Sequence, residues 1–163
     1  MKDIIDVEIK TRTVDFATCK TDLLAIGHFS DAKGLDKLSA ELNRKLDGAI
    51  ERLIELGDFK GKDGTSAVVY GNANIGAKRV LLVGLGEKKK ATLDTIRKAG
   101  AHAANKAVSM EAETLSLAVH SAFGGRFDQG KMGQACAEGV YFGSYRYDAV
   151  SYTHLTLPTT PYV

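Results

Sequence analysis

Residues 79–85 (RVLLVGL) limit most strongly what this chain can fold into, because the run is almost entirely apolar. A strand with one face in water alternates polar and apolar residues, whereas a strand covered on both faces is a nearly continuous apolar run. We therefore predict a central strand over residues 79–85, with other elements packed against both of its faces.

Three stretches have the apolar spacing of helices. From position 35 to position 56, apolar residues recur every three or four positions, which predicts one helix that Gly57 closes as a left-handed cap. The residues of this stripe are Leu35, Leu38, Leu42, Leu46, Ala49, Ile50, Leu53 and Ile54. Two further helices are predicted over residues 92–108 and 128–146, the latter with Asp128 as its N-cap.

The remaining apolar segments have strand patterns. Ile5, Val7 and Ile9 alternate with charged residues, and further strands are predicted over residues 22–27, 65–70 and 114–119. Polar and glycine-containing turns, among them residues 72–76, separate the segments. Strands interleaved with helices predict an α/β fold with a mixed, mostly parallel sheet and helices on both faces.

The composition changes abruptly after Asp148. Residues 1–148 contain no proline, whereas residues 150–163 (VSYTHLTLPTTPYV) contain both prolines of the chain and no Asp, Glu, Lys or Arg. This run resembles one translated frame of a sequencing-library adapter. We therefore interpret residues 1–148 as one domain and residues 149–163 as a non-native, disordered tail, with the natural chain cut after Asp148. Tyr152 and His154 are accordingly not candidates for a site.

The charge and apolar content exclude some partners. The net charge is +2, so the chain offers no strong electrostatic attraction for nucleic acid or for an anionic membrane. There is no apolar N-terminal leader and no apolar run near the length of a membrane span, which predicts a soluble, cytoplasmic protein. Cys19 and Cys136 lie far apart in the sequence and are predicted to be reduced thiols that pack as small apolar groups.

One glycine motif lies where a phosphate-binding turn would be. Gly84 and Gly86 follow the predicted central strand, but Lys89 stands at the third position of the dinucleotide-binding pattern GxGxxG. We interpret the motif as a tight turn, and nucleotide binding remains the alternative. Lys88–Lys90, with Lys78 and Arg79 nearby in the sequence, are interpreted as a solvated corner rather than as an anion-binding patch.

No catalytic group is evident in residues 1–148. His28, His102 and His120 are isolated from one another, and Ser121 and Ser144 lack the GxSxG context of a nucleophile. We therefore predict no catalytic, cofactor-binding or metal-binding residue in this chain.

Two sequence blocks, taken together in their order and separation, indicate a family. Residues 78–88 (KRVLLVGLGEK), followed by residues 96–101 (IRKAGA), and then residues 137–148 (AEGVYFGSYRYD) resemble the N-terminal domain of the leucyl aminopeptidase (cytosol aminopeptidase) family. The resemblance implies a macro-domain-like α/β module. It also implies a parent enzyme that uses two Zn²⁺ or Mn²⁺ ions to remove N-terminal residues and that assembles as a homohexamer. The family's metal ligands lie in a C-terminal catalytic domain and have no matching positions here.

The resemblance leads to one expectation and two alternatives. We expect an accessory domain that is truncated before the catalytic domain, is inactive alone, holds no cofactor and has that missing domain as its partner. The alternatives are a module that binds ADP-ribose or another nucleotide near Gly84–Gly86 or Gly124-Gly125, and a domain that binds DNA, against which the near-neutral charge argues. Val140, Tyr141 and Phe142 are expected to be ordinary core residues rather than a surface for the catalytic domain.

Overall fold

A computed structural model describes residues 2–3, 7–144 and 146–147 of the chain. Its elements are β1 (Lys2–Asp3), β2 (Thr21–His28), α1 (Lys37–Lys45), α2 (Ala49–Glu55), β3 (Ser66–Tyr70), β4 (Ala77–Gly84), η1 (Lys88–Lys90), α3 (Leu93–Ser109), β5 (Leu115–Leu117), η2 (Val119–Phe123), α4 (Gln129–Ser144) and β6 (Arg146–Tyr147). The tail predicted over residues 149–163, including Tyr152 and His154, lies outside the described residues.

The main sheet has four strands in the order β3-β4-β2-β5. β2 is parallel to both β4 and β5, and β3 pairs antiparallel with β4. The predicted mixed, mostly parallel sheet is therefore confirmed. β4 contains most of the run 79–85, and its residues from Val80 to Val83 are at most 2% exposed, because helices cover both faces.

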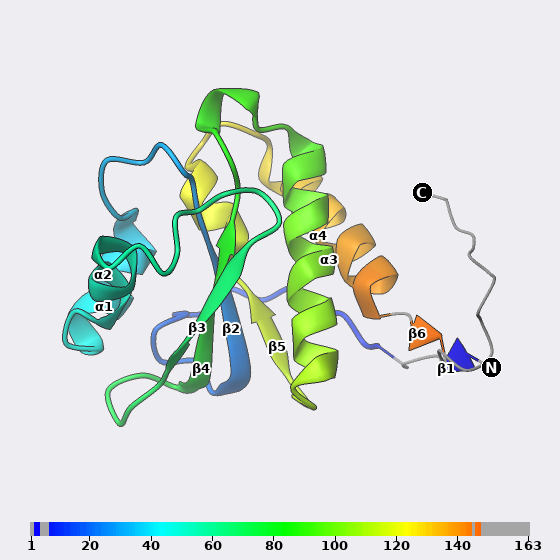
Figure 1. Cartoon of the computed structure of the whole chain (residues 1–163). Coiled ribbons are helices and arrows are strands. Elements are labelled where there is room, and N and C mark those ends of the chain that lie inside the picture. The colour runs from blue at the N-terminus through cyan, green and yellow to red at the C-terminus, as the bar shows by residue number, and fades with distance from the viewer. Residues whose placement is uncertain (1, 4–6, 145, 148–163) are drawn as a thin grey trace.

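Two hydrophobic cores lie on opposite faces of this sheet (Figure 1). On one face, Leu24 and Ile26 of β2 pack with Leu42 of α1 and Ile50 of α2. On the other face, the alternate β2 residues Leu23 and Ala25 pack with α3 and with residues of α4. This division follows from the period of two along a strand, which sends successive side chains to opposite faces.

The helix predicted over residues 35–56 is in fact two helices. α1 ends at Lys45 and α2 begins at Ala49, and Asp47 and Gly48 in the break between them have φ values of 57° and 82°. The buried Asn43 side chain accepts hydrogen bonds from the backbone N–H groups of Ile50 (3.1 Å) and Glu51 (3.0 Å). It thus provides an acceptor for N–H groups at the start of α2 that have no partner within the helix. The apolar stripe continues across the break. Gly57, with φ 81°, closes α2 as predicted.

Other sequence predictions fail at the ends of the chain. Residues 7–10 have no regular secondary structure, so the strand predicted from Val7 and Ile9 is wrong there, and Ile5 lies outside the described residues. An alternation of apolar and polar residues shows only that a segment could bury one side as a strand. To form a strand, the segment also needs a neighbouring strand that exchanges backbone hydrogen bonds with it. Arg146 lies in β6, which pairs antiparallel with β1, rather than in the last helix.

The expectation that three residues near the end of α4 belong to the core is only partly correct. Val140 is buried as predicted, but Tyr141 and Phe142 are 58% and 61% exposed and are not core residues. They lie on the outer side of α4, because the buried Gly139 and Gly143 occupy the side that packs on α3. Among the described residues, no helix is long and apolar enough to cross a bilayer.

Candidate functional site

The candidate binding site is the crevice at the carboxyl ends of β2 and β4. From β2 the chain continues to α1 on one face of the sheet, and from β4 it continues through η1 to α3 on the other face (Figure 1). In open α/β sheets, ligands bind where neighbouring strands send their connections to opposite faces. Two cavities, of about 410 and 310 Å³, lie at this point. Their volumes lie within the range of small-molecule sites.

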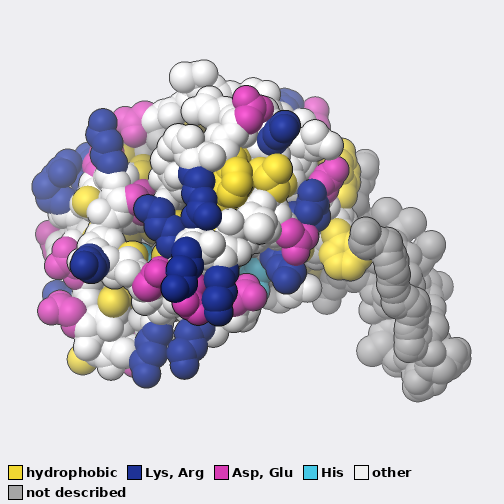
Figure 2. Space-filling model, turned by 90° about the horizontal axis from the view of Figure 1, so that it is seen from above, with side chains coloured by type: hydrophobic (Ala, Val, Ile, Leu, Met, Phe, Trp, Pro, Cys, Tyr) yellow, Lys and Arg dark blue, Asp and Glu magenta, His cyan; other side chains and the backbone are white. Residues whose placement is uncertain are grey.

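The larger cavity lies beside the start of α3 and is lined by residues of both charges. The charged residues are Lys62, Asp63, Glu87, Lys90, Asp94 and Lys98. Lys90 Nζ is 3.0 Å from Glu87 Oε2, and Lys98 Nζ is 3.6 Å from Asp94 Oδ2. Figure 2, which views the face that carries the strand ends, shows Lys and Arg side chains interspersed with Asp and Glu. The carboxylates therefore offset much of the positive charge of the lysines.

The Gly84–Gly86 turn borders this cavity, but its backbone N–H groups already have partners. They donate to carbonyl oxygens, from Gly84 to Thr65 (2.8 Å), from Leu85 to His28 (3.0 Å) and from Gly86 to Gly61 (2.9 Å). A phosphate cradle needs such N–H groups to point at the ligand. A Cβ at Gly84 would overlap the carbonyl oxygen of Lys62, and Gly86 has φ 75°. These contacts support the interpretation of the motif as a tight turn.

The smaller cavity is bordered by His28 and Asp36. Burial lowers the pKa of His28. The Asp36 carboxylate accepts hydrogen bonds from the Ser39 hydroxyl (2.6 Å) and backbone N–H (3.4 Å) and so caps α1. The Ser121 hydroxyl donates to Asp36 (3.3 Å) and to the carbonyl of Ala118 (2.9 Å). Ser121 thus contacts both the cap of α1 and the carbonyl of its own 3₁₀ turn.

The other two histidines lie on separate elements. His102 Nε2 is 2.8 Å from the Ser66 hydroxyl, which joins α3 to β3. The His120 ring meets the Phe16 ring edge-on, with the centroids 5.9 Å apart. Burial lowers the pKa of both histidines. Within residues 2–3, 7–144 and 146–147, no three His, Cys, Asp or Glu side chains form a group that could hold a metal ion.

The remaining candidates have local structural contacts. The Ser144 hydroxyl donates to the Tyr141 carbonyl (3.2 Å) within α4. Lys88–Lys90 form the exposed η1, which agrees with a solvated corner. Gly124 and Gly125 lie in an exposed loop after η2, and Gly124 has φ 57°.

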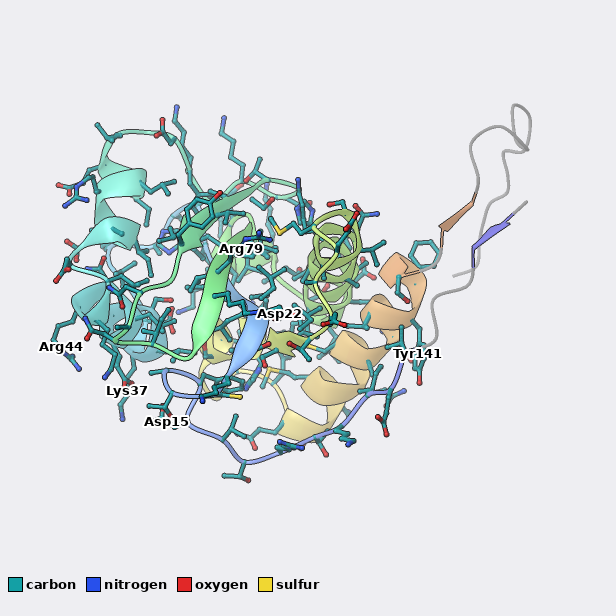
Figure 3. The ribbon with its side chains drawn as sticks, turned by 90° about the horizontal axis from the view of Figure 1, so that it is seen from below. Asp15, Asp22, Lys37, Arg44, Arg79 and Tyr141 are labelled. Carbon is teal, nitrogen blue, oxygen red and sulfur yellow. The ribbon has the colours of Figure 1, made fainter. Side chains whose placement is uncertain are left out.

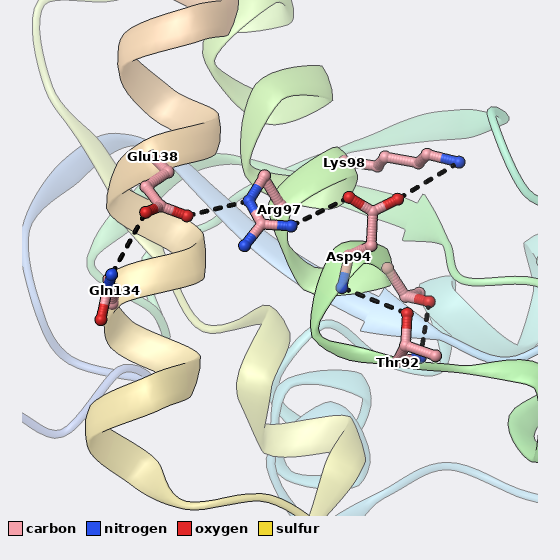
Figure 4. Close-up of polar contacts among 7 residues, drawn as sticks. Thr92, Asp94, Arg97, Lys98, Gln134 and Glu138 are labelled. Carbon is pink, nitrogen blue, oxygen red and sulfur yellow. Dashed lines mark hydrogen bonds and ion pairs between the residues drawn. The ribbon is translucent and has the colours of Figure 1, made fainter. Parts of the chain in front are cut away.

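A bridge that the sequence patterns did not predict joins the crevice to α4 (Figure 4). Arg97 of α3 donates to Asp94, which lines the larger cavity, and to Glu138 of α4, both at 2.9 Å. Glu138 also accepts a hydrogen bond from Gln134 (3.2 Å), and the pKa of Glu138 is lowered, chiefly by the hydrogen bond from Arg97. The spacings Asp94–Lys98 and Gln134–Glu138 are the four-residue signal that sequence offers for such helix-surface pairs.

Comparison with known proteins identifies the domain. The model of the cytosol aminopeptidase family, N-terminal domain, matches residues 25–151, a range that runs from β2 past the end of α4. The chain belongs to this family.

Relatives of the cytosol aminopeptidase family are much longer than this chain. The chain is 34% identical over 113 residues to the probable cytosol aminopeptidase of Cyanothece sp., which covers 69% of this chain and 23% of the relative. It is 32% identical over 131 residues to that of Alkaliphilus oremlandii, which covers 78% of this chain and 25% of the relative. The chain thus spans about a quarter of the length of these relatives.

Solved structures agree with this assignment. A mutant of tomato leucine aminopeptidase superposes with a TM-score of 0.65 at 28% identity, over 79% of this chain and 27% of the tomato chain. The bottromycin maturation enzyme BotP, solved in complex with Mn, gives a TM-score of 0.57 at 30% identity, over 82% of this chain and 25% of its own. The macrodomain of Mycobacterium tuberculosis DarG gives a TM-score of 0.60 at 15% identity, over 78% and 86% of the two chains, which shows the macro-like fold alone.

Proposed function

We propose that this chain is the non-catalytic N-terminal module of a longer metalloaminopeptidase, which removes N-terminal residues from peptides. One observation carries the proposal: the chain matches the N-terminal domain of the cytosol aminopeptidase family and spans only about a quarter of its relatives. The similarity to a leucine aminopeptidase and to an enzyme solved with Mn supports a metalloaminopeptidase as the longer protein.

The parent enzyme is expected to hold two Zn²⁺ or Mn²⁺ ions. The described residues of this chain do not fit them, because no three His, Cys, Asp or Glu side chains there form a group that could hold a metal ion. We propose that the ions and the peptide site belong to the part of the longer protein that follows this domain. That part is the proposed partner of the chain. A cytoplasmic homohexamer remains our expectation for the parent, and the names of its relatives support the cytosol.

The test is hydrolysis of leucine p-nitroanilide by the purified chain, with Mn²⁺ or Zn²⁺ added. We expect no rate above that of the metal alone, while the full-length Alkaliphilus oremlandii relative serves as the positive control. Metal-dependent hydrolysis that copurifies with this chain through two chromatographic steps would overturn the proposal.

Binding of ADP-ribose or another nucleotide is a second candidate function, which the crevice favours. The larger cavity has lysines and hydroxyl groups in its wall, and Ala122, two residues before Gly124, lines the smaller one. The occupied N–H groups of the Gly84–Gly86 turn argue against a phosphate cradle at that turn. Isothermal titration calorimetry with ADP-ribose decides the question, because a bound nucleotide would release or absorb heat that the protein-free titration lacks.

A further inference from the structure

Two aromatic side chains at the carboxyl-terminal end of α4 keep more than half of their surface exposed. Tyr141 is 58% exposed and the adjacent Phe142 is 61% exposed, although both follow the buried Val140. Figure 3 shows Tyr141 near the end of α4, on the side of the molecule away from α1 and α2. Tyrosine and phenylalanine are enriched at protein–protein interfaces, where they contribute much buried area. Two neighbouring aromatic residues on one helix end therefore indicate an interaction surface.

A two-stranded ribbon lies at the same corner of the molecule. β1 pairs with β6 through Lys2 and Tyr147 and through Asp3 and Arg146, and this pair is separate from the four-stranded sheet. β6 begins two residues after the last residue of α4, and Figure 1 shows the ribbon beyond that end of the helix. A two-stranded ribbon is marginally stable in water unless another surface packs against it. The ribbon thus points independently to a neighbour at this corner.

We propose that the domain that follows this one in the longer relatives docks on the corner formed by Tyr141, Phe142 and the β1–β6 ribbon. The proposal rests on the proposed function. The matched model is an N-terminal domain, and most of the length of the relatives lies outside the matched quarter. Because the chain leaves α4 at this corner, the following domain starts beside it. The other large exposed apolar side chains, such as Leu56 directly after α2 and Tyr70 on β3, lie away from this exit.

The experiment measures how fast a thiol reagent reaches the corner with and without the following domain. Tyr141→Cys is introduced into this chain and into a chimera in which the chain replaces the N-terminal domain of the Alkaliphilus oremlandii relative. Both proteins carry Cys19→Ser to remove the partly exposed native thiol. Tyr70→Cys is the matched control, because Tyr70 is 74% exposed and lies on β3.

We expect the thiols at positions 141 and 70 to react at similar rates in this chain. In the chimera, the thiol at position 141 should react roughly tenfold or more slowly, because access then requires local opening of the interface. The thiol at position 70 should keep its rate. An unchanged rate at position 141 in the folded chimera overturns the docking surface.

Two further measurements keep the outcomes distinct. Protection of position 141 that increases with the concentration of this chain alone would assign the corner to a second copy and would overturn the proposal. If the chimera does not fold, cysteines at the two aligned positions of the full-length relative decide the question in its place. Leucyl amide hydrolysis is measured on the same samples, so a failed peptidase assignment is separated from a failed docking surface.

Discussion

Gly139 of α4 lies directly against the carbonyl oxygen of Arg97 in α3. A Cβ at Gly139 would overlap that oxygen, and a Cβ at Gly143 would overlap the carbonyl oxygen of Ala101. The two helix backbones are therefore as close as residues without a side chain allow. Through this contact α4 brings Met132, Ala135 and Cys136 into one of the two cores.

Replacement of Gly139 by alanine should destabilise the domain. The new methyl group meets backbone atoms, which cannot rotate away as a side chain can, so one helix must shift. We expect Gly139→Ala to lower the free energy of unfolding by about 1–3 kcal/mol, the usual cost of overpacking a core. Urea denaturation followed by far-ultraviolet circular dichroism measures this change.

Gly133→Ala is the matched control on the same helix. Gly133 is exposed, and a Cβ there meets no atom within 4 Å. This variant should gain stability by roughly 0.5–1 kcal/mol, because alanine favours the helix over glycine. Equal gains for both variants would show that α3 and α4 do not meet as closely at Gly139 as described.

Asn43 makes a second contact whose loss can be measured. Its side chain, 9% exposed, accepts two hydrogen bonds from the start of α2. Asn43→Ala leaves both donors without this acceptor and should cost about 1–2 kcal/mol of stability in the same urea assay. Asn105→Ala on the exposed side of α3 should stay within about 0.5 kcal/mol of the unsubstituted chain. A matching result for the two asparagines would contradict the capping role.

The break between α1 and α2 shows why the sequence predicted the apolar stripe on this face of the sheet but not the two separate helices. Leu42, Leu46 and Ile50 all enter the same core, so their apolar spacing continues across the break. Asp47 and Gly48 have positive φ at the break, but the apolar spacing alone fits a single helix. The Asn43 cap spans seven and eight residues, and no helical spacing indicates such a contact.

The crevice could not be predicted from the apolar patterns, because its position depends on which strands are neighbours in the sheet. The patterns predicted β2 and β4 as strands, but not that they are parallel neighbours, which brings His28 beside Gly84. The bridge from Arg97 to Glu138 joins residues 41 positions apart, which local spacing cannot reveal. The family blocks were more informative because the glycines at 84 and 139 are both sites of close backbone approach.

The stability of the domain should depend on Asp22 in acid. The pKa of Asp22 is lowered below 3.8, first by the hydrogen bond from the Glu113 backbone N–H and then by Lys78, whose Nζ is 3.1 Å away. The unfolded state therefore binds the proton more readily, so stability falls as the pH falls below about 3.8 towards the folded-state pKa. Asp22→Asn should be less stable near neutrality.

The acid dependence of Asp22→Asn is compared by urea midpoints at about pH 6 and about pH 3. The variant should lose less stability between these two pH values than the unsubstituted chain, because the titrating carboxylate is gone. Asp58→Asn, at an exposed position after α2, should lose as much stability in acid as the unsubstituted chain. The prediction fails if Asp22→Asn shows that same loss.

The two thiols should react at different rates, and the reaction of Cys136 should report on the packing of α4. Cys136 is 9% exposed, and burial raises its pKa to about 11, whereas Cys19 is partly exposed. At about pH 8 a disulfide reagent should react with Cys19 rapidly and with Cys136 only when α4 opens, since the thiolate is the reactive form. In urea both should react rapidly, and Cys19→Ser should abolish the fast native phase. Two fast native thiols would contradict the burial of Cys136.

Gly139→Ala provides the decisive comparison for this slow phase. Cys136 lies opposite Gly100 at the same crossing of α3 and α4, where a Cβ on Gly100 would lie 2.8 Å from the carbonyl oxygen of Cys136. A methyl group at position 139 should weaken the crossing and speed the labelling of Cys136, whereas Gly133→Ala should leave that rate unchanged or slow it. If Gly139→Ala destabilises the domain without changing the slow phase, the thiol is exposed by an opening that does not involve this crossing.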